Sequence, residues 1–350
     1  MSMKRSSLVL AAVFTASIAG SVYAADVPAK PVKKTSPPPE LPFFLVNDNR
    51  LTYAYLFTGT FPGVTNLTSR QTVAFTHFDA WAYGTNFINL GYSKSSHSDP
   101  AVPCTPVLAI PTGCAGRTEF YAVARSTFGW NQIFDTKAFN LGPLNNISFE
   151  VGADVGTENS YYASDTRKLL AGLQFQFALP YKGYVNVAPL IYQEWTHDGY
   201  LQTGSQFVPP GLTGLPDGEL NYHPSWALEI NYYMDLGFLP AELQYFAISG
   251  RAGFYGPGGT GGPGPYSVPA SFNTTVQIES EPIRLTFDAS KAIWGEKYSH
   301  FVDVWVAYRY WKNKFGLDDS NPANFLCYTN GVNNHTCTEN SLYSGITVKF

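Results

Sequence analysis

Charged, polar and aromatic side chains recur at every second position in several segments of this 350-residue chain. Near its end, the even positions from Val302 to Tyr310 are apolar or Tyr, whereas the odd positions from Asp303 to Asn313 include charged residues and Trp. Side chains alternate between the two faces of a β-strand, so such segments predict strands with one apolar and one polar face. The polar faces combine carboxylates, amides and guanidinium groups with aromatic rings, which suits binding of a small polar solute that carries a ring. The candidate binding residues are His77, Asp79, Glu119, Tyr121, Arg125, Glu150, Asp154, Glu194, Glu229, Trp305, Arg309, Trp311 and Asn313.

The same groups allow two other interpretations. Arginines and carboxylates on one face could pair with each other and brace the wall without binding a solute. His77 with Asp79, and His197 with Asp198, could indicate a hydrolase. Adjacent residues of a strand project to opposite faces, so His197 and Asp198 make a poor pair, and no serine lies in a Gly-x-Ser-x-Gly motif. We therefore expect a protein that is not an enzyme, with no metal and no cofactor.

The alternating segments predict about twelve strands. Phe149 and Val151, for example, alternate with Glu150 and Asp154. Pro282 interrupts one segment and predicts a bulge there, because proline has no N–H group to donate within a sheet. The expected strand centres are Tyr55, Phe75, Asn89, Tyr121, Val151, Leu173, Val187, Leu228, Tyr245, Leu285, Tyr308 and Ile346.

Short and long connections alternate between these strands. The short ones span residues 83–86, 180–183, 236–241 and 294–300, and residues 130–144 form one of intermediate length. The long ones span residues 59–70, 95–116, 157–167, 197–223, 256–274 and 316–340. Short turns at one end and long loops at the other are typical of outer-membrane β-barrels. An even number of strands would place both chain ends on the periplasmic side.

The composition favours a membrane barrel over a soluble protein. Charged residues make up 14% of the chain and aromatic residues 16%, whereas charged residues make up about 25% of soluble proteins. Tyr and Trp gather at the two membrane interfaces of barrels. The alternative is a soluble secreted β-sandwich, in which the polar strand faces would lie outside. The formal net charge of −4 gives no reason to expect nucleic-acid binding.

Residues 1–24 have the features of a cleaved signal peptide. Lys4 and Arg5 precede an apolar stretch from Leu8 to Ala19, and residues 22–24 fit a small-x-small cleavage site. No other run approaches the ~18 apolar residues of a membrane helix. We therefore expect export, and a location in the outer membrane of a Gram-negative bacterium.

Two further segments complete the expected organisation. Residues 25–48 are rich in Pro and Lys and predict an extended periplasmic segment, so the transmembrane barrel is expected over residues 49–350. The alternating segment from Tyr343 to Phe350 resembles the terminal strand that barrel-insertion machinery recognises. The expected partners are therefore the outer-membrane lipid, this machinery and a small solute.

The four cysteines form two close pairs in long loops at the same end of the expected barrel. Four cysteines allow three pairings, of which the local one is the simplest. The export route is oxidising. We predict the disulfides Cys104–Cys114 and Cys327–Cys337, and no metal site.

Six motifs follow one another along most of the mature chain. They are THFDAWAYGTNF at residues 76–87, TEFY at 118–121 with Arg125, LGPL at 141–144, EVGAD at 150–154, EWTHDG at 194–199 and YRYWKNKFG at 308–316. Together they resemble the Tsx-like nucleoside-specific channels of the outer membrane and the related outer envelope proteins. The resemblance implies a monomeric, twelve-stranded barrel with a narrow pore that takes up nucleosides and deoxynucleosides. The two Cys-bearing loops and the Gly/Pro-rich residues 256–265 depart from that family.

The expected barrel size limits the function. Twelve strands about 4.8 Å apart and tilted by about 40° give a backbone diameter of about 24 Å, and side chains reduce the opening to about 12 Å. Such a width predicts passive diffusion of one small polar solute at a time, with a nucleoside as the expected solute. The alternatives are a general porin or a porin for another nutrient, and a structural or adhesive barrel that acts through its loops.

Overall fold

The computed structural model describes residues 42–350 except 97–115, 161–162, 206–207, 209–210 and 260–272. The predicted signal peptide, most of the predicted periplasmic segment and the predicted Cys104–Cys114 pair lie outside these residues. No helix in the described part of the chain is long and apolar enough to cross a membrane.

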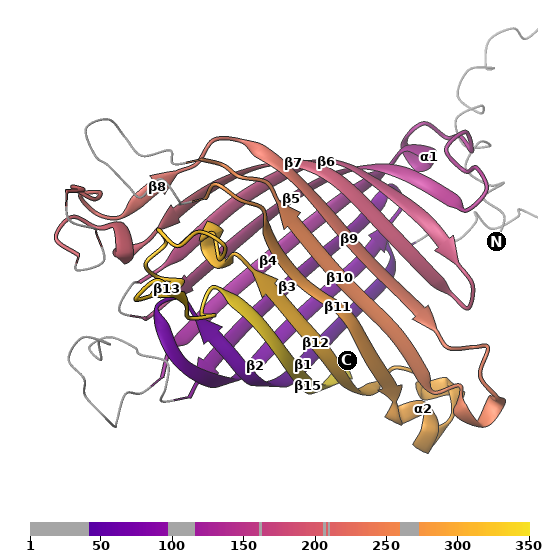
Figure 1. The fold of residues 1–350 in the computed structure, drawn as a ribbon. Helices are drawn as coiled ribbons and strands as arrows, with labels where there is room; N and C mark the ends of the chain where they lie inside the picture. Colours follow the sequence, from indigo (N-terminus) through magenta and orange to yellow (C-terminus); the bar gives the residue numbers. More distant parts are fainter. Residues whose placement is uncertain (1–41, 97–115, 161–162, 206–207, 209–210, 260–272) are drawn as a thin grey trace, which may run out of the picture. The chain divides into compact units, whose positions relative to one another are not determined.

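Twelve antiparallel strands form a closed barrel (Figure 1). Each strand pairs with its neighbour in the chain, and the ring closes because the last strand, β15, pairs with β1, while β6 pairs with β7. The predicted all-β fold with twelve strands is therefore confirmed. In order around the ring, the strands are β1 (Phe44–Phe61), β2 (Val64–Trp81), β3 (Gly84–Ser95), β4 (Thr118–Gly129), β5 (Leu144–Glu158), β6 (Asp165–Leu179), β7 (Gly183–His197), β9 (Ser225–Asp235), β10 (Phe246–Tyr255), β11 (Gln277–Asp288), β12 (Val302–Lys312) and β15 (Thr338–Lys349).

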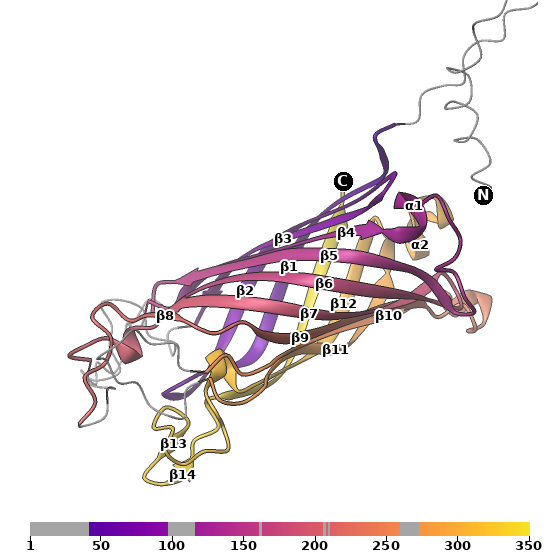
Figure 2. The same ribbon diagram turned by 90° about the horizontal axis from the view of Figure 1, so that it is seen from above.

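The two ends of the barrel differ (Figures 1 and 2). At one end, here called the turn end, the connections are short and hold the small helices α1, α2, η3 and η4. At the other, the loop end, the longer connections hold η2, η5, a short strand β8 added to β7, and the hairpin β13–β14. These elements are α1 (Trp130–Ile133), η2 (Gly199–Leu201), β8 (Glu219–Asn221), η3 (Ala241–Leu243), α2 (Ala289–Trp294), η4 (Glu296–Tyr298), η5 (Lys314–Gly316), β13 (Tyr328–Thr329) and β14 (Val332–Asn333).

The predicted strand centres agree with the strands at every position but one. Tyr245 lies just before β10, which begins at Phe246. The predicted bulge is present, because the register between β11 and β12 shifts between Ser280 and Ile283, on either side of Pro282. The odd-numbered side chains of β11 therefore face the interior before Pro282, and the even-numbered ones face it after Pro282.

The prediction of a long loop over residues 59–70 is wrong. β1 continues to Phe61 and β2 begins at Val64, so the two strands are joined by a tight turn in which Gly63 has a φ of 77°. Phe61 and Val64 are both buried beneath the other loops, and their burial stabilises the extended ribbon. β1 also begins at Phe44, earlier than the predicted start of the barrel at residue 49, because Phe44 pairs with Trp81 of β2.

The loops at the loop end share a hydrophobic cluster. The cluster is formed by Phe61, Val64, Leu201, Leu215, Leu220, Tyr222, Leu317, Leu326, Cys327 and Cys337. The predicted Cys327–Cys337 disulfide is confirmed, with the two Cα atoms 5.4 Å apart. The disulfide joins two residues of the connection between β12 and β15 within this cluster. The connections at the loop end are thus packed against one another, and together they are called the cap.

The two faces of the barrel wall differ in composition. On β12, Val304 and Val306 face outward and are 46% and 44% exposed, whereas Trp305 faces the interior and is 4% exposed. Other exposed apolar residues of the outer face are Leu51, Tyr53, Val73, Leu90, Val151, Val155, Leu169, Ile191, Leu285, Leu342 and Ile346. The outer surface of the wall is thus an apolar band.

Large interior side chains lie opposite glycines of the next strand. Trp305 pairs with Gly345, Arg125 with Gly152, and Tyr121 with Gly156. A Cβ atom at position 345 would lie 2.4 Å from the indole ring of Trp305 and 2.6 Å from the Tyr53 carbonyl oxygen. Glycine at these positions therefore lets the large side chains lie flat against the wall.

We predict that Gly345→Ala destabilises the barrel by about 1–3 kcal/mol, because the added methyl group overpacks against Trp305 and the backbone of β1. Gly91→Ala is the matched control, since a Cβ atom at this interior position would have its nearest neighbour at 3.6 Å. The measurement is urea unfolding of both variants in lipid vesicles. Equal stability of the two variants would contradict this role of Gly345.

Candidate solute-binding cavity

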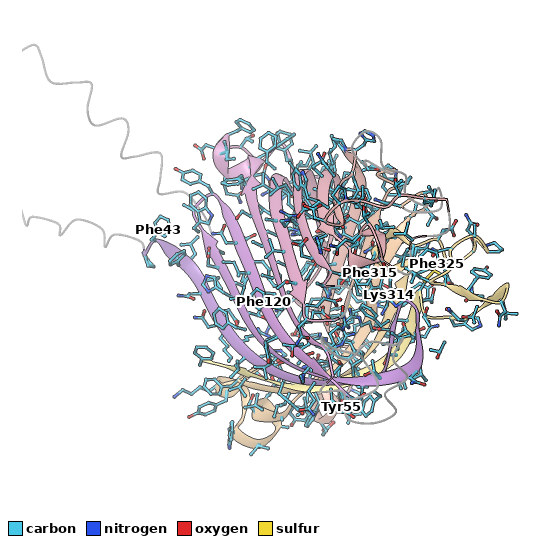
Figure 3. All side chains as sticks on the ribbon, turned by 90° about the vertical axis from the view of Figure 1, so that its left-hand side faces the viewer. Phe43, Tyr55, Phe120, Lys314, Phe315 and Phe325 are labelled. Atoms are coloured by element: carbon cyan, nitrogen blue, oxygen red, sulfur yellow. A yellow bond between two sulfur atoms is a disulfide. The ribbon has the colours of Figure 1, made fainter. Side chains whose placement is uncertain are left out.

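A cavity of about 1500 Å³ occupies the interior of the barrel. Its lining includes Asp48 and Asp303 near the turn end, and Arg117 and Lys314 near the loop end. Figure 3 looks onto the loop end and shows Lys314 and Phe315 close together there. The cavity therefore extends along the barrel from one end toward the other.

Ten of the thirteen predicted binding residues line this cavity. They are Glu119, Tyr121, Arg125, Glu150, Asp154, Glu194, Glu229, Trp305, Arg309 and Trp311. Period-2 alternation found them because these strands have one clearly apolar face.

His77 and Asp79 lie on the outer face, so their predicted inward orientation is wrong. The interior face of β2 consists of its even-numbered residues, among them Thr76 and Phe78. His77 Nε2 lies 3.1 Å from Asp79 Oδ2, and Asn86 donates a hydrogen bond of 2.9 Å to the other oxygen of Asp79. Both faces of β2 carry polar residues, so the sequence does not show which of the two faces the interior.

Asn313 does not continue the interior face of β12. The strand ends at Lys312, and Asn313 has a left-handed backbone with a φ of 55°. Its side chain donates a hydrogen bond of 2.7 Å to the Val276 carbonyl and accepts one of 3.0 Å from the Asp319 N–H. It therefore fixes the start of the loop after β12, and the prediction that it lines the pore is wrong.

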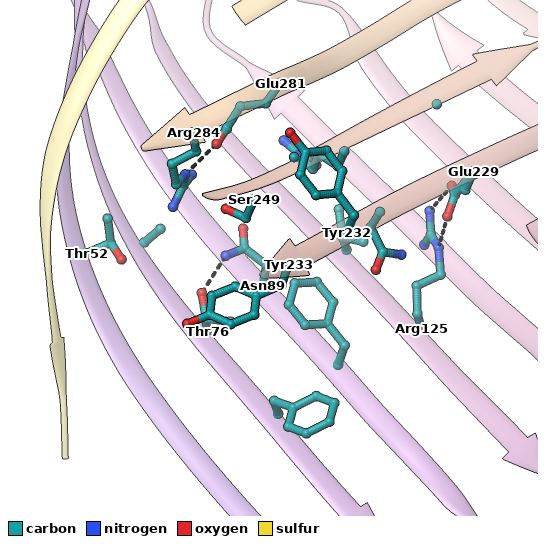
Figure 4. A pocket seen from close by; sticks show the side chains of 18 of the residues that line it. Thr52, Thr76, Asn89, Arg125, Glu229, Tyr232, Tyr233, Ser249, Glu281 and Arg284 are labelled. Atoms are coloured by element: carbon teal, nitrogen blue, oxygen red, sulfur yellow. Dashed lines mark hydrogen bonds and ion pairs between the residues drawn. The ribbon is translucent and has the colours of Figure 1, made fainter. Parts of the chain in front are cut away.

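Arg125 and Glu229 are joined by hydrogen bonds inside the cavity (Figure 4). From β4, Arg125 forms a bidentate contact with Glu229 on β9, at 2.6 and 2.9 Å, although these strands are not neighbours in the ring. Its Nη1 lies 2.5 Å from Asp154 Oδ1, and its Nε lies 3.9 Å from Glu150 Oε1. The bridge between Arg125 and Glu229 narrows the path along the barrel.

Neighbouring groups extend this network along the wall. Tyr255 donates a hydrogen bond of 2.9 Å to Glu229. Lys168 lies 3.8 Å from Glu194 and 4.5 Å from the centre of the Tyr255 ring. Most interior charges thus pair with one another, as the alternative of a braced wall anticipated, and they leave few groups free for a solute.

A second charged network joins the cap to the barrel at the loop end. Lys314 Nζ lies 2.6 Å from Glu339 Oε2 and donates a 2.6 Å hydrogen bond to the Thr60 carbonyl. Arg309 Nε lies 3.1 Å from the other oxygen of Glu339. Burial lowers the pKa of Lys314 to about 8, although Glu339 favours its charged form. This network fixes η5 at the mouth of the cavity.

The two tryptophans predicted to bind a solute differ in their contacts and in their exposure to the cavity. Trp305 lies beneath the Arg284 guanidinium, 4.0 Å from the ring centre, and contacts the ring of Tyr343. Its N–H donates a 3.0 Å hydrogen bond to Thr347, so it serves the wall. Trp311 also lies beneath cations, with the Arg309 guanidinium 5.3 Å and Lys314 Nζ 4.9 Å from its ring centre. Because Trp311 is partly exposed whereas Trp305 is buried, Trp311 is the better candidate for contact with a solute.

Several cavity residues on β6, β10 and β11 were not predicted. They are Lys168, Arg251, Tyr255, Glu279, Glu281 and Arg284. Alternation alone would have found those on β6 and β10. The bulge at Pro282 hid those on β11, because Glu279 and Glu281 face inward before it and Arg284 faces inward after it.

Acidic groups surround His300 at the turn end. Its Nδ1 lies 3.0 Å from Asp303 Oδ1, and its Nε2 lies 3.1 Å from the Tyr233 hydroxyl and 3.8 Å from Asp235. Asp288 caps α2 and also accepts a hydrogen bond from the His300 backbone. The hydrogen bond to Asp303 raises the pKa of His300 above its ordinary value, against the effect of burial.

The chain matches no protein-family model and no curated protein sequence. Among solved structures, it is similar to the NanC porin, with a TM-score of 0.39 and 10% identity over 87% of this chain and 100% of that one. The translocator domain of the autotransporter NalP from Neisseria meningitidis gives 0.39 and 10% over 87% and 89%. The outer membrane protein OpdK from Pseudomonas aeruginosa gives 0.30 and 8% over 88% and 100%. Similarities this remote indicate no shared ligand or partner.

We predict that Arg125→Ala destabilises the barrel by about 3–5 kcal/mol, because Asp154 and Glu229 lose their cation while remaining largely buried. Arg167→Ala is the control. Arg167 pairs with Glu219 at 3.1 Å, but the two side chains are 47% and 52% exposed, so its loss should cost about 1 kcal/mol or less. Guanidinium unfolding of both variants measures the difference, and similar losses would contradict the importance of the central bridge.

We also predict that the barrel loses stability as the pH rises through the raised pKa of His300. The folded state favours protonated His300, so this contribution is complete below the ordinary histidine pKa of about 6.5 and disappears above the folded one. His300→Gln should remove this part of the pH dependence. Melting temperatures from about pH 5 to pH 9 provide the measurement, and an unchanged profile in the variant would refute the assignment.

Proposed function

We propose that this protein is an outer-membrane channel through which small polar solutes, and nucleosides in particular, diffuse passively. The observation that carries the proposal is the cavity of about 1500 Å³, which extends from residues of the turn end to residues of the loop end inside a closed barrel. A closed barrel satisfies the backbone hydrogen bonds of its strands without water, which a membrane requires.

The outer face supports the membrane location. Exposed apolar side chains such as Val304, Val306 and Ile191 form the outward surface of the strands, and lipid is the solvent in which such a surface is stable. With the turn end in the periplasm and the loop end outside the cell, the N-terminal segment would lie in the periplasm. Export by the signal peptide and insertion through the strand that ends at Phe350 belong to the same proposal.

Nucleosides suit the composition of the cavity. A nucleoside combines a flat base with a hydroxyl-rich sugar, and the cavity offers Trp311 and Tyr121 beside carboxylates, amides and guanidinium groups. The resemblance to Tsx-like channels supports the same solute class. The central bridge of Arg125 and Glu229 would force solutes to pass in single file.

We predict that purified protein in a planar bilayer gives a small single-channel conductance, which nucleosides reduce and simple sugars do not. Trp311→Ala should weaken the reduction by nucleosides, because it removes an aromatic face from the path. Val304→Ala on the outer face of the same strand is the control. Equal indifference to nucleosides and sugars would leave only a general porin, and equal behaviour of both variants would refute the role of Trp311.

A further inference from the structure

Two opposite charges on the cavity wall form no ion pair or hydrogen bond within the described part of the chain. Every charged side chain that lines the cavity forms an ion pair or hydrogen bond within the described part of the chain, with three exceptions. The exceptions are Arg251, Glu279 and Lys182. Lys182 lies in the turn between β6 and β7, whereas Arg251 and Glu279 lie within strands, on the interior wall. Arg251 is exposed to the cavity and Glu279 is partly exposed.

Arg251 and Glu279 occupy adjacent strands of one wall. Arg251 of β10 is opposite Glu281 of β11, and Glu279 is opposite Gly253. Glu281 forms its ion pair with Arg284, and among the described residues no carboxylate lies within ion-pair distance of Arg251. Arg251 and Glu279 thus belong to two successive cross-strand pairs on the interior face of β10 and β11. They are therefore close enough to bind the two ends of one solute.

Aromatic groups flank the two free charges. Trp311 of β12 is directly opposite Glu279 and is partly exposed. The Tyr255 ring lies over Gly253, since a Cβ atom at that position would be 2.8 Å from it. The wall therefore presents a guanidinium group, a carboxylate and aromatic surface within a few residues.

We propose that Arg251 and Glu279 form a subsite for zwitterionic solutes of the free amino acid class. Arg251 binds the solute carboxylate, for which the guanidinium fork is the matching donor. Glu279 binds the solute ammonium group, and the partly exposed Trp311 favours solutes with an aromatic side chain. A neutral nucleoside would offer neither group an ionic partner, and a simple anion would meet the repulsion of Glu279. This subsite rests on the proposed channel but not on nucleosides as its solutes.

Three solutes with one aromatic framework test the proposal. L-phenylalanine carries both charges, 3-phenylpropionate only the negative one and 2-phenylethylamine only the positive one. In planar-bilayer recordings of the full barrel, L-phenylalanine should reduce the single-channel current at lower concentration than either of the others. Arg251→Gln should raise its half-blocking concentration about tenfold, as expected for loss of a charge-assisted hydrogen bond. Glu279→Gln should do the same.

The two variants should differ on the singly charged solutes. Arg251→Gln should weaken the effect of 3-phenylpropionate only, and Glu279→Gln that of 2-phenylethylamine only. Lys182→Gln, which removes the third unpaired charge, is the control and should leave the effect of L-phenylalanine unchanged. An L-phenylalanine effect that survives both central variants, or that disappears with Lys182→Gln, overturns the subsite. Current without any effect of the three solutes also overturns it while leaving the channel, whereas absence of current overturns the channel itself.

Discussion

The contact of Arg125 with Glu229 and Asp154 organises the interior of this barrel. It connects β4 with β9, two strands that are not neighbours in the ring, and fixes the position of Glu229. Glu229 in turn accepts a hydrogen bond from the hydroxyl of Tyr255. Asp154 is almost completely buried, so loss of this guanidinium group would leave its carboxylate without its cation. Of the charged groups on the described strands that line the cavity, Arg251 and Glu279 form no ion pair, and both lie on the wall of β10 and β11. The shape of the cavity therefore depends on a few ion pairs as much as on the number of strands.

The sequence predicted the strands well because a barrel wall imposes one strict rule. Each strand must present an apolar face outward, and the alternation of Val304 and Val306 with Trp305 follows this rule directly. The rule fails where both faces are polar, as in β2, and His77 and Asp79 were assigned to the wrong side. It also fails across Pro282, where the parity changes within a strand.

The pairing inside the barrel could not be predicted in the same way. Local alternation identifies Arg125 and Glu229 as interior residues, but their contact depends on closure of the ring between β6 and β7. The loops pose a related problem. Residues 59–70 have the glycine and polar content of a loop, yet burial of Phe61 and Val64 under the cap extends β1 and β2 instead. Tertiary burial outweighs local preference there.

The glycines opposite Trp305, Arg125 and Tyr121 have a consequence for how such a barrel can vary. The diameter of the backbone is fixed by strand number and tilt, which a point substitution does not alter. The free bore is set instead by whether each large side chain lies against the wall or stands toward the axis. A single methyl group at Gly152 or Gly156 would push Arg125 or Tyr121 inward. One twelve-stranded frame can therefore yield pores of different calibre through exchanges of one residue, with the outer surface unchanged.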